Sequence, residues 1–159
     1  MSGVVEQIFL ARHESGPTAP IDEVEAVPGH GLVGDRYWYE NGDAGPGKAI
    51  TLIAAEAIEG YASDTGDPLE PGEHRRQVVT RGIDVNALVG RRFRVGAVEC
   101  EGVELCEPCN HLQKLTGRDG LMRNLVHRAG LSADVVNGGT IRVGDSVEAV
   151  EQDAAAGTA

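Results

Sequence analysis

The chain has 159 residues, of which 41% are hydrophobic, so we expect one domain over residues 1–150 with a core that needs no disulfide bonds. Its formal net charge of −11 argues against non-specific binding to DNA or RNA, because such binding depends on neutralising phosphates. No apolar run approaches the roughly 20 residues that span a bilayer, and residues 1–10 lack the basic start of a signal peptide. We therefore expect a cytoplasmic protein with no membrane or nucleic-acid partner. The small, polar residues 151–159 are expected to form a disordered tail.

The first half of the chain alternates short apolar runs with glycine-rich turns, a pattern typical of strands joined by tight turns. We expect strands at residues 4–11, 23–27, 49–53 and 77–80. The segment 28–36 contains three glycines and is predicted to be a loop with positive φ angles. Within it, Asp35 and Arg36 could pair with each other or with another loop. A helix is expected over 54–61, followed by a polar loop over 62–73.

The second half is predicted to add three strands, at residues 92–95, 97–105 and 146–150. Along 97–105, apolar and acidic residues alternate, and Gly102 interrupts the alternation as a bulge or turn would. The alternation places Cys100 on the apolar face, where a thiol behaves as a small buried hydrophobe. Asn137-Gly138 lies between two apolar runs and predicts a β-hairpin with a primed turn.

Two more helices are expected, one over 110–116 closed by Gly117 and one that begins after an N-cap at Asp119 and ends at Ala129. In the second helix, Arg123 and His127 would share one face, where they could meet an anion or simply face solvent. About eight short strands with two or three helices indicate a mainly β fold of the α+β class. We expect a closed or nearly closed β-barrel with helices packed on it.

Basic residues are concentrated in one part of this acidic chain. Residues 75–128 contain ten basic and six acidic residues, whereas the remainder contains four basic and 19 acidic ones. Two of the three cysteines lie in this cationic segment, in the sequence Cys106-Glu107-Pro108-Cys109. An odd number of clustered cysteines favours reduced, functional thiols over a disulfide framework. Cationic surroundings also favour the thiolate, which is both the nucleophile and the metal ligand.

The Cys-x-x-Cys spacing leaves several interpretations open. It suits half of a zinc site, although only Cys100 and His111 lie near enough in sequence to add ligands. A thioredoxin-type dithiol would need a βαβ pattern that the chain lacks. One working thiolate could serve as a soft metal ligand or a sulfur carrier, or the segment could be a turn with two incidental thiols. Of the two, Cys109 follows Pro108 and precedes an expected helix, whose N-terminus stabilises a thiolate, whereas the charge of Glu107 raises the pKa of the Cys106 thiol.

Arg75 and Arg76 precede an apolar strand. Their guanidinium groups match phosphate and carboxylate, although such pairs also occur on solvated surfaces. Because neighbouring residues of a strand point to opposite sides, we expect only one of the two to face a site. The loop residues His30 and His74 have no evident role.

Taken together, these features resemble the MOSC domain, the module named for the C-terminal part of molybdenum cofactor sulfurase. Each motif is weak alone, and the resemblance depends on their order and spacing along nearly the whole chain. The matching motifs lie at residues 28–37, 50–53, 75–77, 82–86, 88–90, 106–109 and 139–145.

The resemblance implies a β-barrel-like fold and a link to the molybdenum cofactor (molybdopterin) or to sulfur transfer. The thiol that the family is proposed to use falls on Cys109, and Cys106 belongs to the subset with two cysteines here. Gln77 stands where relatives often have Asn, which leaves open any cofactor contact made by that amide. The cofactor's phosphate would be held by arginines. The candidates for that role are Arg36, Arg75, Arg76, Arg81 and Arg123.

These considerations lead to one expected function and two alternatives. The first is a molybdenum-cofactor-binding protein with Cys109 as the metal ligand, which would reduce N-hydroxylated or N-oxide compounds with an electron-transfer partner. The second is a non-redox carrier in which Cys109 bears a persulfide received from a cysteine desulfurase. The third is a zinc-stabilised binding module. In the first case the protein would also bind a small-molecule cofactor or substrate. Whether the protein is an enzyme stays open.

Overall fold

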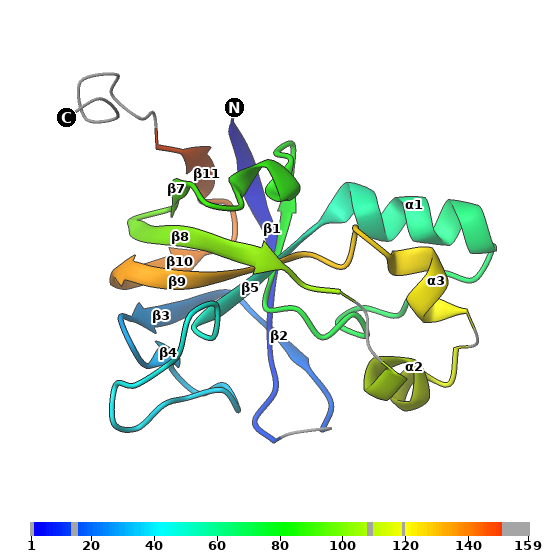
Figure 1. The fold of residues 1–159 in the computed structure, drawn as a ribbon, viewed down its shortest axis with the longest axis horizontal. Helices are drawn as coiled ribbons and strands as arrows, with labels where there is room; N and C mark the ends of the chain where they lie inside the picture. Colours follow the sequence, from blue (N-terminus) through cyan, green and yellow to red (C-terminus); the bar gives the residue numbers. More distant parts are fainter. Residues whose placement is uncertain (1, 14–15, 108–109, 119, 151–159) are drawn as a thin grey trace.

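The protein is described by a computed structural model that covers residues 2–13, 16–107, 110–118 and 120–150. The expected disordered tail over 151–159 lies outside the described residues. Figure 1 shows a β-barrel with its helices gathered on one side. This arrangement confirms the mainly β fold with a closed barrel and a few helices.

A closed barrel of seven strands forms the body of the molecule. The last strand pairs with the first, antiparallel, with Ser2 opposite Glu148, and this pairing closes the barrel. Between its strands only β5 and β6 run parallel, and the other neighbours are antiparallel. In order around the barrel the strands are β1 (Ser2–Leu10), β6 (Val78–Arg81), β5 (Ile50–Ala54), β9 (Leu131–Asn137), β8 (Val98–Leu105), β7 (Arg92–Val95) and β11 (Ser146–Ala149).

A smaller sheet and a short edge strand complete the β-structure. The three-stranded sheet consists of β10 (Gly139–Arg142), β3 (Glu23–Val27) and β4 (Gly31–Leu32), in that order. The strand β2 (Ala19–Ile21) pairs only with β1 within the described sheets. Both β2 and β4 were missed by the sequence analysis, because two or three residues are too few to show a period of two.

Alternating burial explains why the barrel strands form where the sequence predicts them. In β7 and β8, Phe93 pairs with Cys100 and Val95 pairs with Val98, and all four side chains are fully buried. The acidic residues between them in β8 point the other way. The register of β8 against β9 shifts between Gly102 and Glu104, which confirms the expected bulge. Cys100 therefore lies in the barrel core, as predicted.

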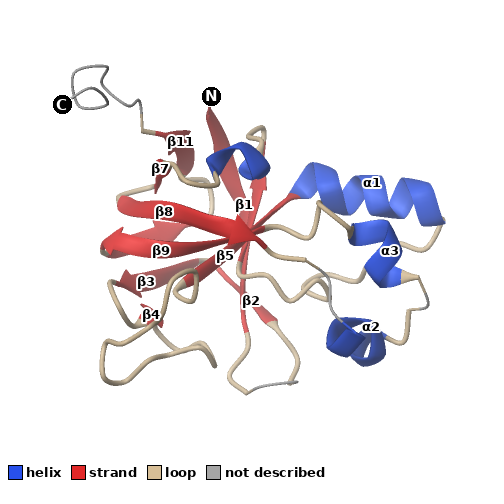
Figure 2. Ribbon diagram, in the orientation of Figure 1, coloured by secondary structure: helices blue, strands red, loops and turns tan. Residues whose placement is uncertain are grey.

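Figure 2 shows the helices α1, α2 and α3 beside the barrel, where a second, smaller core lies. The helix α1 (Ala55–Thr65) follows β5 directly and ends at Gly66, whose φ is 67°. The helices α2 (Asn110–Thr116) and α3 (Leu121–Leu125) follow β8, and a short 3-10 helix (Val85–Leu88) packs near β8 and β9. The buried residues of the helical core are Tyr61, Leu121, Leu125 and Ala129.

Two sequence predictions are wrong. Asn137-Gly138 makes no hairpin, because β9 pairs with β8 and β5 whereas β10 pairs with β3 in the other sheet. Neither residue has the positive φ that a primed turn needs. The expected helix over 120–129 ends already at Leu125, and His127 adopts a φ of 62°. The expected N-cap, Asp119, lies outside the described residues.

Over the described residues, we find no helix whose length and apolar character would let it cross a membrane.

Candidate functional site

A pocket of about 370 Å³ opens where the barrel meets the segments that lead to the helices. Four segments supply its walls: the loop after β4, the loop before β5 with Thr51 itself, the turn before β6, and the end of β8. Ser132 of β9 completes the lining. The end of β8 and the turn before β6 are far apart in sequence. In the barrel their strands are separated by β9 and β5, and both segments line this one pocket.

The lining is predominantly cationic. Arg36, Lys48, Arg75 and Arg76 line the pocket together with only two carboxylates, from Glu104 and Glu107. Two tyrosines, Tyr37 and Tyr39, add aromatic surface, and the Arg36 guanidinium lies 4.4 Å from the centre of the Tyr37 ring. An excess of positive charge in a concave site favours an anionic ligand.

Arg75 has an unused hydrogen-bond donor. Its Nη1 donates to the carbonyl oxygen of Gly16, while its Nη2 is buried and has no hydrogen-bond partner within the described part of the chain. Burial lowers the pKa of the Arg75 guanidinium, and the positive charge of Arg36 lowers it further. Two cations that repel each other, one with a free donor, make a site for an anion that would accept from that donor.

Arg76 is held by its backbone and side chain at once. Its backbone N–H donates to Nδ1 of His74 at 2.9 Å, and its Nε donates to the carbonyl oxygen of Ala129 at 2.7 Å. Burial lowers the pKa of His74 to about 4, and the charge of Arg76 contributes to the same shift. The imidazole is therefore neutral at neutral pH, which leaves Nδ1 free to accept. His74 thus has a role that the sequence analysis did not assign.

The paired arginines do not alternate as predicted. Arg75 lies in a turn, with a φ of 63°, and its N–H donates to the carbonyl oxygen of Gly72. The strand β6 begins only at Val78, so the rule that neighbours point to opposite sides does not apply. Both Arg75 and Arg76 line the pocket.

Cys106 is the thiol that the structure places in the pocket lining. It is half-buried, and its N–H donates to the carbonyl oxygen of Gly130 at 2.8 Å. Burial raises the pKa of the Cys106 thiol, and the positive charge of Arg76 opposes that shift. Cys106 is therefore a protonated thiol at neutral pH. Cys109 lies outside the described residues, two positions after Glu107, which also lines the pocket.

A buried polar network lies behind the pocket wall. Asp35, only 5% exposed, accepts three hydrogen bonds: from Ala11 N at 3.0 Å, from Tyr37 N at 3.2 Å and from Gln77 Nε2 at 2.8 Å. The Oε1 of Gln77 accepts from Thr51 N at 2.9 Å. Both ends of the Gln77 amide are thus engaged within the protein.

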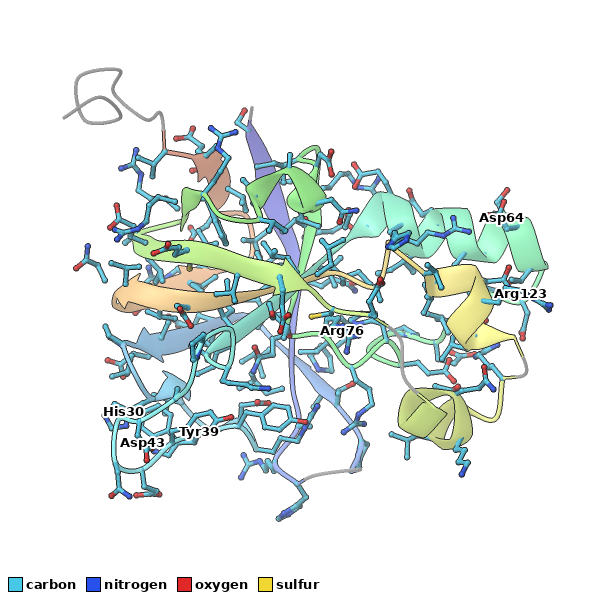
Figure 3. The ribbon with its side chains drawn as sticks, in the orientation of Figure 1. His30, Tyr39, Asp43, Asp64, Arg76 and Arg123 are labelled. Atoms are coloured by element: carbon cyan, nitrogen blue, oxygen red, sulfur yellow. The ribbon has the colours of Figure 1, made fainter. Side chains whose placement is uncertain are left out.

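Two of the predicted arginines lie elsewhere. Arg81 donates to the carboxylates of both Glu6 and Glu59, and it does not line the pocket. Arg123 is exposed on α3, and Figure 3 shows it at the outer side of the helices, away from Arg76. His127, which was expected to share a helical face with Arg123, lies beyond the end of α3 and pairs with Glu107 at 3.0 Å. The structure therefore brings together Arg36, Arg75, Arg76 and Cys106, and it leaves out Arg81 and Arg123.

The sequence analysis missed several residues of the pocket. Lys48 stands between Gly47 and Ala49, and Tyr37 and Tyr39 stand on either side of Trp38, so nothing in their local pattern marks them. Asp35 was expected to pair with Arg36 or with another loop, and its burial was not foreseen, although a carboxylate in an otherwise apolar and glycine-rich loop is a signal for a buried hydrogen-bond acceptor.

The described residues contain no group of three or more His, Cys, Asp or Glu side chains placed to hold a metal ion. The zinc alternative would need Cys109 and His111, whose side chains are not among those described. The residues whose side chains are described therefore give the zinc alternative no support.

Comparison with known proteins identifies the family. The sequence profile of the MOSC domain matches residues 40–148. No curated protein is significantly similar in sequence. YuaD from Bacillus subtilis has a similar structure, with a TM-score of 0.79 at 18% identity over 96% of this chain and 98% of its own.

YiiM from Geobacillus stearothermophilus gives a TM-score of 0.75 at 16% identity, covering 98% of this chain and 78% of its own. YiiM from Escherichia coli gives 0.73 at 17% identity, covering 96% and 71%. At these identities the likeness concerns the fold. Because the family profile covers more than half of the sequence, the chain belongs to the MOSC domain family.

Proposed function

We propose that the protein binds the molybdenum cofactor in this pocket, with Cys109 as the thiolate ligand of molybdenum. The MOSC family is linked to proteins of the molybdenum cofactor. The observation that carries the proposal is the meeting of Arg36, Arg75 and Arg76 around one pocket, with the Nη2 of Arg75 lacking an acceptor among the described residues. A phosphate group is the type of ligand that would satisfy such a donor.

The residues present fit this group. Its phosphate is an anion, and the lining has four cationic side chains against two carboxylates. Arg guanidinium forks bind phosphate with two parallel hydrogen bonds, and a thiolate is a soft ligand that suits molybdenum. When bound, the cofactor would supply the redox chemistry for reducing N-hydroxylated or N-oxide compounds.

The chain's own residues would bind and orient the cofactor. Arg75 and Arg36 would hold the phosphate, because their guanidinium groups lie near each other and Arg75 has the free donor. Arg76 would face the thiol end of the pocket, since its charge acts on Cys106. Cys106, protonated at neutral pH, would be an accessory thiol rather than a ligand.

The test is metal and cofactor analysis of protein produced in a host that makes the molybdenum cofactor. We expect Cys109→Ser to abolish molybdenum retention, Arg75→Gln to reduce it strongly and Cys106→Ser to weaken it. Arg123→Gln is the matched control, because Arg123 is an exposed arginine outside the pocket lining. Full molybdenum content in Cys109→Ser, or equal losses in Arg75→Gln and Arg123→Gln, would refute the proposal.

A persulfide carrier is the second candidate, and the position of Cys106 favours it. Cys106 lines the pocket under the influence of Arg76 and Lys48, whose charges would stabilise a persulfide anion on a neighbouring cysteine. Trapping of persulfide on freshly purified protein distinguishes the two candidates. Persulfide on Cys109 without bound molybdenum would favour the carrier, and bound molybdenum without persulfide would favour the cofactor protein.

A further inference from the structure

Asp35 is a buried carboxylate whose acceptor capacity is used by N–H groups rather than by arginines. Its two oxygens receive hydrogen bonds from Ala11 N, Tyr37 N and Gln77 Nε2. Among the described ion pairs it takes part in none. A buried charge normally needs a direct partner, and here the partners are amide dipoles.

These hydrogen bonds join the segments that carry the cationic wall. Asp35 precedes Arg36, and the Gln77 that it binds follows Arg76. Gln77 in turn binds Thr51 through both its backbone and its side chain. The N–H of Arg36 also donates to the carbonyl oxygen of Ala11 at 2.7 Å. Two lining segments are thereby joined at the Asp35 carboxylate, and the third, at Thr51, is joined to them through Gln77.

The arrangement leaves the arginine donors free for a ligand. The negative charge of Asp35 raises the pKa of the Arg75 guanidinium and so opposes the effect of burial on that pKa. Because its oxygens are occupied by N–H groups, it does not take up the guanidinium donors. A direct ion pair, like those of Arg81 with Glu6 and Glu59, would remove the donors from the pocket.

We propose that Asp35 is a positioning residue of the pocket: through Gln77 it sets the spacing of Arg36 and Arg75 so that both guanidinium groups face one anion. The inference rests on the anion-binding role proposed above for the same pocket. Only a carboxylate fits this position, since three N–H donors converge on its two oxygens. An amide would direct its own NH₂ group at one of them.

The electric field in the pocket can be measured with Cys106 as the probe. In a Cys109→Ala background of the full chain, Cys106 is alkylated in parallel by iodoacetate, an anion, and by iodoacetamide, which is neutral and of similar size. Cys100 does not compete because it is fully buried. The ratio of the two rates cancels the thiolate fraction and the accessibility of the thiol, so it reports the attraction of an anion into the pocket.

The sign of the change in Asp35→Asn decides the question. Removing a negative charge without moving the arginines would raise the iodoacetate to iodoacetamide ratio. If Asp35 positions the arginines, the ratio falls instead. A retreat of one guanidinium from about 4 to about 6 Å lowers it by about two- to tenfold at effective dielectric constants between about 80 and about 20.

Two further variants keep the test decisive if Asp35→Asn folds poorly. Gln77→Met removes the link without changing any charge and is expected to lower the ratio. The double variant Asp35→Asn with Gln77→Glu restores the hydrogen bond between these two positions and keeps the total charge, although an amide NH₂ still faces a backbone N–H at position 35, so the ratio should recover part of the way from the Asp35→Asn value toward the parent value. Val147→Ala, a core change away from the pocket lining, should lower stability and leave the ratio unchanged.

A raised ratio in Asp35→Asn, an unchanged ratio in a folded Gln77→Met, or no recovery in the double variant would each overturn the positioning role. None of these outcomes depends on molybdenum. If metal analysis fails while the ratios behave as expected, the cofactor proposal is wrong and the positioning of an anion site stands. If the cofactor is retained by wild type while the ratios do not respond, only the role of Asp35 is rejected.

Discussion

His74 is a neutral imidazole behind a cationic wall. It is 4% exposed, it packs edge-on against Phe9, and its Nδ1 accepts the N–H of Arg76. Protonation would remove that acceptor and place a third positive charge beside Arg75 and Arg76. The residue therefore couples the shape of the pocket to its own charge state.

The stability of the protein should depend on this histidine below neutral pH. Burial lowers the pKa of His74 from 6.5 to about 4 in the folded state, so between these values only the unfolded chain takes up the proton. The stabilisation is present above pH 6.5 and is lost as the pH falls toward about 4. We expect this histidine to lower the free energy of unfolding by about 2 kcal/mol from about pH 7 to about pH 5.

Urea unfolding of wild type and His74→Gln at both pH values measures this effect. The variant should show a smaller decrease, because glutamine does not titrate and can still accept the Arg76 N–H. His13→Gln, at an exposed histidine, should retain the wild-type decrease. An identical decrease in wild type and His74→Gln would show that other groups cause the pH dependence.

Cys100 is predicted to be structural. It is fully buried opposite Phe93, and burial raises its pKa to about 12, so it is an unreactive thiol. Cys100→Ala should lower the free energy of unfolding by about 1 kcal/mol through the cavity that it leaves. Denaturant titration measures the loss, and molybdenum or persulfide content should remain at the wild-type level. Selective loss of binding in a stably folded variant would contradict this expectation.

For the pocket, the sequence indicated which types of side chain would bind a ligand, but it did not indicate the backbone conformation of the residues that carry them. Arg75 and Arg76 were identified as candidates because guanidinium groups match phosphate. The left-handed φ of Arg75 is costly for a residue with a side chain, and it exists only because surrounding contacts impose it. One such contact comes from a distant segment, at Gly16, and no local pattern reveals it.

At the scale of elements, the bulge in β8 brings this strand against the 3-10 helix. Gly102 N donates to the carbonyl oxygen of Arg91, and the Gly102 carbonyl oxygen accepts from Gly90 N. A Cβ added at Gly102 would lie 2.0 Å from the carbonyl oxygen of Leu88. The position thus requires glycine because of close backbone contact, and its φ is not in the left-handed region.

Gly102→Ala should therefore be destabilising. The side chain would meet backbone atoms that cannot move independently, and we expect a loss of about 1 to 3 kcal/mol in the free energy of unfolding. Gly139→Ala in β10 is the matched control, since the added Cβ would make only ordinary contacts, at 3.6 Å from Ala97 and Val98. Thermal unfolding compares the two. Equal stability of both variants would mean that the 3-10 helix shifts freely away from β8.

The false hairpin at Asn137-Gly138 shows where local turn chemistry loses to the barrel. The end of β9 pairs with β8 through Asn137 opposite Glu99, and Gly138 then passes close to the carbonyl oxygen of Ala26 in β3. Strand pairing on both sides of Gly138 thus directs the chain from the barrel into the smaller sheet. Pairings between distant strands decided the outcome, whereas the apolar runs on either side of Asn137-Gly138 had indicated that both strands exist.

At the scale of the whole molecule, the barrel and the helices each have a core, and a third buried cluster joins Ala55 and Ile58 of α1 to Phe9, Ile53 and Val79 of the barrel strands. The barrel core includes Leu131, and the helical core contains Leu125. A small core of four buried residues with one partly buried neighbour should open more readily than the barrel. Cys106 and Glu107, which line the pocket, lead from β8 toward α2, so this side of the pocket is expected to be the more dynamic.

Leu125→Ala should loosen the helices without unfolding the barrel. Loss of this buried side chain should lower the stability of the helices by about 2 to 5 kcal/mol, which is more than we expect a core of this size to contribute. In native-state hydrogen exchange we expect faster exchange in α1 and α3 and unchanged protection in β8 and β9. Leu131→Ala should accelerate exchange in both regions. Uniform acceleration in Leu125→Ala would show that the molecule opens as one unit.

Pattern and composition were sufficient for the fold class, the barrel strands and the thiol-bearing segment. They were insufficient for the closing pair β1–β11, for the smaller sheet and for the pocket, which all depend on contacts between distant residues. Arg81 illustrates the limit, because its position in β6 places it beside Glu6 and Glu59, which lie 75 and 22 residues away in sequence.

The pairing of Ser2 with Glu148 also makes the chain a candidate for circular permutation. Because the first and last barrel strands are neighbours, a short linker from Val150 to Ser2 would cross little distance and disturb no strand. New ends could be placed at the exposed residues 41–43, which join no strand of either sheet. The order of the segments along the chain is thus separable from the architecture, and a permuted chain would keep the strand pairings of the barrel, with its new ends between Tyr39 and Gly47 of the pocket lining.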